Sequence, residues 1–410
     1  MEWFSELRVL RSFSLIKYLG LTYMHSTTMM DDGKTQAFVD AEPPRTPKAL
    51  LKRYNELLKT GKVQWTTYHR LERELGRGGQ GTVYLSARKG ADGFNQPVAM
   101  KVFSPERFAS GHAYRQAMER IAHVASRVAT IQHDNLLDVQ DFVDRNQIRI
   151  MVMEWIDGFD LRQLMNPDRL RLLKTTAKTK RWEYVNSVIA TLGPKQTRFK
   201  AGIAVAIVRD CLGGLGALHR QGVVHGDIKP ANIMLKRTGN AKLIDMGSAF
   251  ELKDPPNNRA CTPAYAAPEV LEGANCTPLS DLASLGYVLI EMLAGKPCFS
   301  ADMNFKELLE AKRKLPQILK DFLPPEVACN EHLLNLCKRF ITPDPLRRFP
   351  SAEAAELLED GAAQFHRQLV FGDLASEYGN DMRVLVEEFC NLQEESADES
   401  PDSTDWNLSI

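Results

Sequence analysis

The sequence lacks an excess of charge of either sign, because 52 lysines and arginines balance 52 aspartates and glutamates among 410 residues. A balanced chain carries no bulk field that would attract nucleic acid, so we expect no nucleic-acid partner. Long apolar runs are also missing, since none approaches the roughly 18 residues that a membrane-spanning helix needs. Acidic residues near the N-terminus, and Lys17 inside the apolar run of residues 13–21, argue against a secretory signal.

Paired cysteine motifs are absent as well. The seven cysteines are scattered without a Cys-x-x-Cys pair, at positions 211, 261, 276, 298, 329, 337 and 390. Such spacing is typical of reduced thiols rather than of a disulfide framework or a zinc site. We therefore expect a cytoplasmic protein.

Changes in pattern divide the chain into segments. Residues 1–45 show weak periodicity and end in a proline pair, which predicts a flexible lead. Residues 46–67 carry leucines at helical spacing after Thr46-Pro47, a cap followed by a first-turn proline, and predict a helical extension. Residues 68–157 are strand-rich with one long helical segment, and residues 158–365 are mainly helical.

Within the helical part, residues 166–200 form a basic insertion. Nine cations face only Asp168 and Glu183: Arg169, Arg171, Lys174, Lys178, Lys180, Arg181, Lys195, Arg198 and Lys200. One interpretation is a solvated surface insertion, and the other is a docking patch for an acidic partner, including the protein's own tail. That tail, residues 366–410, predicts one amphipathic helix followed by an acidic stretch too polar to order itself.

Chemistry is concentrated in His225-Gly-Asp-Ile-Lys-Pro-Ala-Asn232, followed by Asp245-Met-Gly. Asp227 can receive a hydroxyl proton, Lys229 can neutralise phosphate charge, and Asn232 with Asp245 can hold magnesium. Four polar residues at fixed spacings between apolar runs are poorly explained by chance. The set predicts phosphoryl transfer.

Two further motifs precede this set. The glycine-rich turn of residues 76–81 contains Gly76, Gly78 and Gly81, and glycines allow a backbone to approach phosphates closely. Val98-Ala-Met-Lys-Val102 is an apolar strand that contains one lysine, Lys101. Either motif alone is weak, because glycine turns and edge lysines are common in proteins.

In this order, the motifs resemble those of eukaryotic-like protein kinases of the serine/threonine class, over roughly residues 68–358. The resemblance implies an α+β, bilobal fold with a strand-rich N-lobe (68–157) and a mainly helical C-lobe (158–365). It also implies ATP and Mg²⁺ as cofactors, with Mn²⁺ as an alternative ion, and protein substrates with Ser or Thr acceptors. Autophosphorylation and the oligomeric state are left open.

The resemblance assigns roles to single residues. Asp227 is the catalytic carboxylate, Lys229 contacts the γ-phosphate, Lys101 binds the α- and β-phosphates, and Glu119 is its candidate partner on the following helix. The nucleotide is expected to contact Val83, Ala99, the gatekeeper Met153, the backbones of Glu154 and Ile156, the ribose-binding Asp160, and Met234 beneath adenine. Asp160 is equally well read as a helix N-terminal acid. Thr262 is expected to position the peptide near Asp227, and Arg348, or its neighbour Arg347, to pair with Glu269.

The sequence also departs from the usual family pattern. Gly226 replaces the arginine that commonly precedes the catalytic aspartate, which predicts a non-RD kinase whose activity is not strictly gated by phosphorylation of the activation loop. The span from Glu119 to His133 is about one helical turn longer than in most relatives.

Two other functions remain as alternatives. A small-molecule kinase of the aminoglycoside or choline type shares the His-Gly-Asp motif but generally lacks the Ala-Pro-Glu and Thr-x-x-Tyr segments, which occur here at 267–269 and 262–265. A pseudokinase scaffold is expected to have lost Lys101, Asp227, Asn232 or Asp245, and all four are present.

Overall fold

A computed structural model describes residues 68–256, 261–371 and 378–398, together with four isolated helical residues, Lys52, Asn55, Leu58 and Lys59. Residues 1–66 form one unit and residues 67–410 another. The predicted lead (1–45), most of the extension (46–67) and the acidic residues beyond 398 lie outside the described residues. The first acids of the tail, Glu394, Glu395 and Asp398, belong to a helix, so the prediction that the acidic stretch does not order itself is wrong for these residues. The larger unit contains all the described residues from 68 onward.

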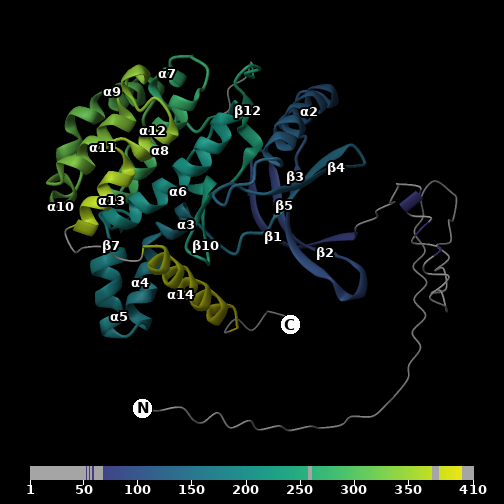
Figure 1. The fold of residues 1–410 in the computed structure, drawn as a ribbon, viewed down its shortest axis with the longest axis horizontal. Coiled ribbons are helices and arrows are strands. Elements are labelled where there is room, and N and C mark those ends of the chain that lie inside the picture. Colours follow the sequence, from purple (N-terminus) through teal and green to yellow (C-terminus); the bar gives the residue numbers. More distant parts are fainter. Residues whose placement is uncertain are drawn as a thin grey trace, which may run out of the picture. The chain divides into compact units, whose positions relative to one another are not determined.

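A five-stranded antiparallel sheet forms the first part of this unit (Figure 1). Its order is β1 (Tyr68–Gly78), β2 (Gly81–Lys89), β3 (Asn95–Phe103), β5 (Ile148–Glu154) and β4 (Val139–Arg145), with the short η1 (Ala91–Gly93) between β2 and β3. Successive side chains of a strand point to opposite faces. In β3, Val98 and Met100 pack with Val152 on one face, whereas Ala99 and Phe103 join the main core on the other. Lys101 shares the face of Ala99, and this alternation directs its ammonium toward the site described below.

Helix α2 (Gly111–Val128) packs beside this sheet. Ser110 caps it by accepting a hydrogen bond from the Ala113 N–H at 3.1 Å. Residues three or four apart share a helix face, and the buried Tyr114, Met118, Ile121, Val124 and Val128 follow that spacing. The face of α2 that is buried in the protein is therefore apolar.

The rest of the unit is mainly helical, so the predicted α+β class is confirmed. The helices are α3 (Leu161–Leu164), α4 (Pro167–Thr176), α5 (Thr179–Tyr184), α6 (Ala201–Arg220), α7 (Pro268–Leu271), α8 (Pro278–Ala294), α9 (Phe305–Phe322), α10 (Pro325–Ala328), α11 (Glu331–Ile341), α12 (Ala352–Leu357), α13 (Ala362–Phe371) and α14 (Tyr378–Asp398). Single turns are η2 (Val185–Ile189), η3 (Pro230–Asn232), η4 (Met246–Ser248) and η5 (Pro345–Arg347). Short strands complete this part. β10 (Ile233–Lys236) pairs with β11 (Ala241–Leu243) on one side and β6 (Gly158–Asp160) on the other, β12 (Phe250–Glu251) pairs with β9 (Val223–Val224), and β7 (Ala190–Leu192) pairs with β8 (Thr197–Phe199).

Helices α6 and α8 are the central helices of this part. Thr277 and Ser280 form a reciprocal capping box at the start of α8, and Gly295 ends it at φ +64°, a conformation that glycine adopts without penalty. Every residue of α8 from Ser280 to Ala294 is buried. Helix α6 is long and apolar enough to cross a membrane, but 72% of its 18-residue apolar stretch is buried inside the protein. Its apolar character is thus accounted for by packing in the core.

The basic insertion is folded and contacts the C-terminal helix. It forms α4, α5, η2 and the β7–β8 hairpin, and α14 lies beside α4, β6 and β10 (Figure 1). The Arg181 guanidinium donates to both Glu388 carboxylate oxygens at 2.7 and 2.9 Å, and the Tyr184 hydroxyl donates to Asp381 at 2.7 Å. The insertion therefore contacts α14 through one ion pair and one hydrogen bond, and its role as a docking patch for an acidic partner stays a prediction.

Candidate active site

The loop between β9 and β10 brings four of the predicted residues together. Lys229 Nζ donates to Asp227 Oδ2 at 2.6 Å, and the Thr262 hydroxyl donates to Asp227 Oδ1 at 2.8 Å. Lys229 Nζ also donates to Thr262 Oγ1 at 3.0 Å. Asn232 Nδ2 donates to the Asp227 carbonyl at 2.7 Å and reaches its Oδ2 at 3.2 Å. The Asp227 carboxylate is thereby fixed on both oxygens.

Asp281 of α8 holds the backbone of this loop. Its carboxylate oxygens accept the His225 and Gly226 N–H groups, each at 2.9 Å, and His219 Nε2 lies 2.9 Å from Oδ2. Because a buried N–H without a partner is costly, one buried carboxylate on a core helix sets the path of the chain into Asp227. Gly226 adopts φ +76°, a backbone conformation that side chains with a Cβ rarely take.

Lys101, on β3, binds Asp245, which lies between β11 and η4. Lys101 Nζ lies 2.5 Å from Asp245 Oδ1 and donates to Gln80 Oε1 at 2.7 Å. Burial by itself would raise the pKa of Asp245, but the Lys101 ammonium outweighs that effect and holds the pKa below its usual range. Asp245 has φ +64°, a strained conformation for an aspartate that is typical of functional sites.

The Lys101 contact with Gln80 was not predicted from the sequence. Gln80 Nε2 also donates to the Ser248 hydroxyl at 3.2 Å, so one amide links the glycine-rich turn to the segment after Asp245. The only sequence signal for this role is an amide side chain beside Gly81, the last glycine of the turn.

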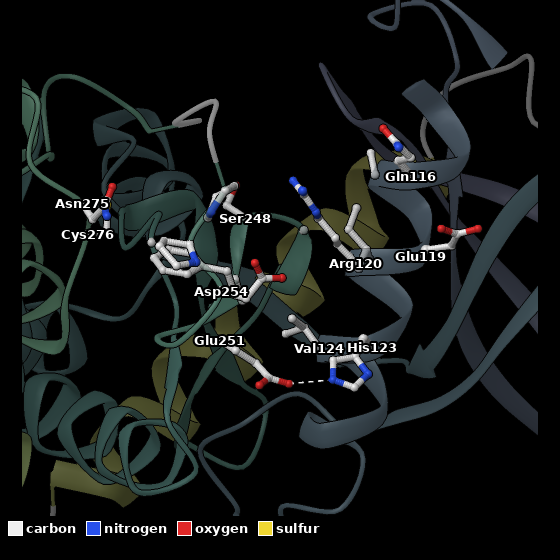
Figure 2. Close-up of a pocket in the computed structure, with 18 of the residues that line it drawn as sticks. Gln116, Glu119, Arg120, His123, Val124, Ser248, Glu251, Asp254, Asn275 and Cys276 are labelled. Atoms are coloured by element: carbon white, nitrogen blue, oxygen red, sulfur yellow. Dashed lines mark ion pairs between the residues drawn. The ribbon is translucent and has the colours of Figure 1, made fainter. Parts of the chain in front are cut away.

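Glu119 is not brought to Lys101 in this structure. It is an exposed residue of α2, and among the described residues no ion pair joins it to Lys101. In Figure 2 its carboxylate points away from Ser248 and Asp254. Glu119 lies on the exposed face of α2, five residues before the buried Val124. The pairing of Glu119 with Lys101 stays a prediction.

The residues predicted to contact adenine follow the sheet register. Val83 pairs with Lys101 across β2 and β3, Ala99 pairs with Met153 across β3 and β5, and Met234 of β10 pairs with Asp160 of β6. Gly76 lies in β1, and Gly78 pairs with Gly81 where the β1–β2 hairpin turns. Apolar side chains at these registers suit a planar aromatic base, and their contact with adenine stays a prediction.

The hinge residues are held by neighbouring groups. The Glu154 N–H donates to the Asp138 carbonyl at 3.0 Å. The Glu154 carboxylate accepts from the Asp138 N–H at 2.8 Å and forms an ion pair with Lys242. Ile156 is buried. Asp160 caps α3 by accepting from the Gln163 N–H at 2.7 Å, and burial raises its pKa. The structure therefore shows the capping role of Asp160, and ribose binding stays a prediction.

Asn232 and Asp245 fit a divalent cation by their chemistry. The Ile244 N–H donates to the Asn232 carbonyl at 2.9 Å, which places Asp245, the next residue, beside Asn232. The Asn232 amide nitrogen is used by Asp227, and among the described residues its side-chain oxygen accepts no hydrogen bond. A carboxylate and a carboxamide oxygen are the hard ligands that magnesium and manganese prefer.

A cavity of about 1060 Å³ lies beside these residues, between α2 and the segment after Asp245 (Figure 2). Its lining includes Gly226, Gly247 and Ser248 but not Asp227, Lys229 or Lys101. His123 Nε2 and Arg127 Nε of α2 meet the Glu251 carboxylate at 2.8 and 3.0 Å at its edge. We therefore assign the candidate site to the polar cluster around Asp227, whose members have the geometry for proton and phosphate contacts, and not to this cavity.

The segment after the active-site loop is also anchored to the core. Tyr265 donates through its hydroxyl to Glu291 at 2.7 Å, and the Gln196 amide donates to the same carboxylate at 3.0 Å. Arg348 forms two 2.7 Å hydrogen bonds with Glu269, which confirms the first of the two predicted arginine partners. These contacts hold Thr262 against Asp227.

Comparison with known proteins agrees with this geometry. Residues 69–359 match the family described as protein kinase domain. The chain is similar to the probable serine/threonine-protein kinase pknA2 of Bifidobacterium longum (29% identity, 65% of this chain, 32% of that protein). It is also similar to the serine/threonine-protein kinase PkaA of Streptomyces coelicolor (30% identity, 61% of this chain, 44% of that protein). A third relative is the probable serine/threonine-protein kinase PknB of Lactococcus lactis (26% identity, 75% of this chain, 43% of that protein). The chain spans less than half the length of these relatives.

Proposed function

The chain belongs to the protein kinase family, and from that premise we propose that it transfers the γ-phosphoryl group of ATP to Ser or Thr hydroxyls of proteins. The observation that carries this proposal is the Asp227 carboxylate, held on one oxygen by Lys229 and on the other by Thr262. A carboxylate so fixed presents a proton acceptor in a defined orientation beside a cation. In protein kinases a carboxylate in this role accepts the proton of the acceptor hydroxyl, while positive charge stabilises the phosphoryl group in transfer.

In the proposed reaction, the acceptor hydroxyl oxygen forms a bond to the γ-phosphorus as the bond to the β,γ-bridging oxygen breaks. Asp227 orients the hydroxyl and accepts its proton, while Lys229 neutralises charge on the phosphoryl oxygens. Lys101 holds the α- and β-phosphates from β3, beside Asp245. Most of the rate enhancement then comes from positioning and from fixed charge.

We assign Mg²⁺ to Asn232 and Asp245, with Mn²⁺ as the alternative ion. When bound, the ion supplies positive charge to the phosphates. Asp245 stays ionised near neutral pH because Lys101 lowers its pKa, so its carboxylate is in the form that binds a cation. Asn232 contributes to both functions, since its nitrogen braces Asp227 while its oxygen remains available.

Gly226 supports a non-RD enzyme. An arginine at this position could bind a phosphate on the activation loop, and glycine has no side chain with which to do so. We therefore propose that phosphorylation of that loop is not required for activity. A cytoplasmic location is also proposed, and seven free thiols are consistent with a reducing compartment.

Two alternatives can be separated from this proposal. A pseudokinase scaffold would bind ATP without transfer, yet Lys101, Asp227, Asn232 and Asp245 are all present and Lys101 is paired with Asp245. A small-molecule kinase would transfer phosphate to an amino-alcohol or aminoglycoside but not to protein. The anchored Thr262–Tyr265 segment favours a protein acceptor.

The test compares wild type with Asp227→Asn, using labelled ATP, Mg²⁺ and a generic protein acceptor. Loss of the base is expected to lower kcat by about 10²–10⁴-fold and to leave the calorimetric affinity for ATP within about threefold, since Asp227 is not assigned to bind nucleotide. The exposed Asp302→Asn is the matched control and should be unchanged. ATP binding without transfer by the wild type would instead establish a scaffold.

A further inference from the structure

Lys312 of α9 is a buried cation that the proposed reaction does not use. Its side chain is 0% exposed, whereas the adjacent Arg313 and Lys314 are exposed. It occupies the core-facing stripe of α9 between Leu308 and Leu315, where the helical spacing calls for an apolar residue. A buried charge is unfavourable unless it has a specific partner.

The partner of Lys312 is a backbone carbonyl in the segment that faces the acceptor. Lys312 Nζ donates to the Ala264 carbonyl at 2.6 Å. It also lies 4.0 Å from the centroid of the Tyr287 ring and 4.3 Å from that of Phe299, two rings in edge-to-face contact. Among the described residues, no carboxylate lies within ion-pair distance of it. The charge is thus stabilised by one carbonyl and two ring faces.

Ala264 lies within the turn that carries Thr262 and Tyr265. The Tyr265 and Ala266 N–H groups donate to the Thr262 carbonyl at 2.9 and 3.0 Å, which closes this turn. Thr262 binds Asp227 and Lys229 at one end, and Tyr265 binds Glu291 at the other. Ala264 has no polar side chain, and its carbonyl connects the middle of the turn to α9 through the Lys312 hydrogen bond.

We propose that Lys312 is a positioning residue for the protein acceptor: it fixes the Thr262–Tyr265 turn, and through that turn the register of the acceptor hydroxyl against Asp227. This inference rests on the proposed transfer to protein acceptors. It assigns no contact between Lys312 and either substrate. Its effect therefore falls on acceptor binding and not on ATP binding.

Protonation of Lys312 should tune this effect. Burial lowers the pKa of Lys312 to about 7. The groups facing it are the Cys298 and Cys261 thiols, the Tyr287 hydroxyl and, beyond Tyr265, the Glu291 carboxylate. Burial raises the pKa of Cys298 and of Tyr287, so both stay neutral near pH 7. Charges on neighbouring elements are paired elsewhere, Arg313 with Glu272 and Glu269 with Arg348.

The sign of the pH effect follows from the contacts. Below about pH 7 the ammonium makes a charge-assisted hydrogen bond and interacts with both rings; above it, the neutral amine loses both advantages. Acceptor KM should therefore rise as pH increases through 7. Acceptor affinity thus falls with rising pH, whereas folding stability should increase with it. The reason is that a lysine whose folded-state pKa lies below its unfolded value penalises the folded state at lower pH.

The test uses the full chain from pH 6 to 8.5. It measures four quantities: the KM for a protein acceptor, the KM for ATP, the kcat and the Tm. Lys312→Met is expected to raise acceptor KM by about tenfold, as for one lost charge-assisted hydrogen bond. ATP KM should stay within about twofold, Tm should not fall, and the pH dependence of acceptor KM should disappear. Lys312→Arg keeps its charge at every pH. At pH 6 its acceptor KM should be close to that of the wild type, and its acceptor KM should not increase above pH 7. Lys314→Met, on the exposed face of α9, is the matched control.

Three results would overturn the inference. Unchanged acceptor KM in Lys312→Met would show that the turn does not need the hydrogen bond. A parallel rise in ATP KM with a fall in Tm would show a merely structural role. An acceptor KM in Lys312→Arg that still rises above pH 7 would assign the titration to another group. Absence of transfer by the wild type would instead refute the proposed function itself, and this inference with it.

Discussion

The pair between Glu269 and Arg348 offers the most quantitative prediction about stability. The Arg348 side chain is 0% exposed and donates two 2.7 Å hydrogen bonds to the Glu269 carboxylate. Its remaining bonds go to the carbonyls of Thr342 at 2.8 Å, Leu279 at 3.0 Å and Pro343 at 3.2 Å. Glu269→Ala would leave all three carbonyl contacts but remove the one carboxylate that, among the described residues, forms an ion pair with this buried guanidinium.

The expected cost of this change is about 3–5 kcal/mol of unfolding free energy, the range for breaking a buried ion pair by removing one partner. Urea unfolding followed by far-ultraviolet circular dichroism gives the difference directly. Glu269→Gln retains an acceptor oxygen without the charge and should lose less. The matched control is Arg347→Ala, since Arg347 is 80% exposed and lies 3.9 Å from Asp344; its change should stay within about 0.5 kcal/mol.

A loss below about 1 kcal/mol in Glu269→Ala would refute this reasoning. It would mean that the three carbonyls suffice to stabilise the cation, or that water reaches the guanidinium once the carboxylate is gone. Either result would also weaken the view that this pair anchors the segment carrying Thr262.

Two further predictions concern the frame around the site. Asp281→Ala should lower the free energy of unfolding by about 2–6 kcal/mol, because the His225 and Gly226 N–H groups would each lose a buried acceptor worth roughly 1–3 kcal/mol. The kcat should fall as well. Urea unfolding and steady-state kinetics measure the two effects, and a stability loss under about 1 kcal/mol would contradict the bracing role of Asp281. For the insertion and the C-terminal helix, a double-mutant cycle of Arg181→Ala and Glu388→Ala should give a coupling of about 1 kcal/mol for this half-buried bidentate pair. The charge-exchanged double variant R181E/E388R should recover part of that stability, and purely additive single losses would show that the two segments do not depend on each other.

Much of the site could be predicted because its residues are close in sequence. Asp227, Lys229 and Asn232 lie within six positions of one loop, so their spacing alone brings them together. The predicted hydrogen bonds of Thr262 with Asp227 and Lys229 are also formed.

The remaining contacts depend on tertiary packing that a linear pattern does not contain. Lys101 contacts Gln80 and Asp245, which lie 21 and 144 positions away in the sequence, whereas Glu119 lies on the exposed face of α2. The folding of the insertion against α14 follows from pairings such as Arg181 with Glu388, more than 200 residues apart. Lys312 did carry a signal, a lysine in an apolar helical stripe, but its partner Ala264 is an ordinary backbone carbonyl.

The central claim is that Asp227, Lys229, Lys101 and the Asn232–Asp245 pair form one phosphoryl-transfer site. Mass-spectrometric mapping of phosphate, after incubation with ATP, Mg²⁺ and a protein acceptor, tests it most directly. We expect phosphoserine or phosphothreonine on the acceptor with the wild type, and none above background with Asp227→Asn. Equal phosphate from both proteins, or none from a folded wild type that binds ATP, would contradict it.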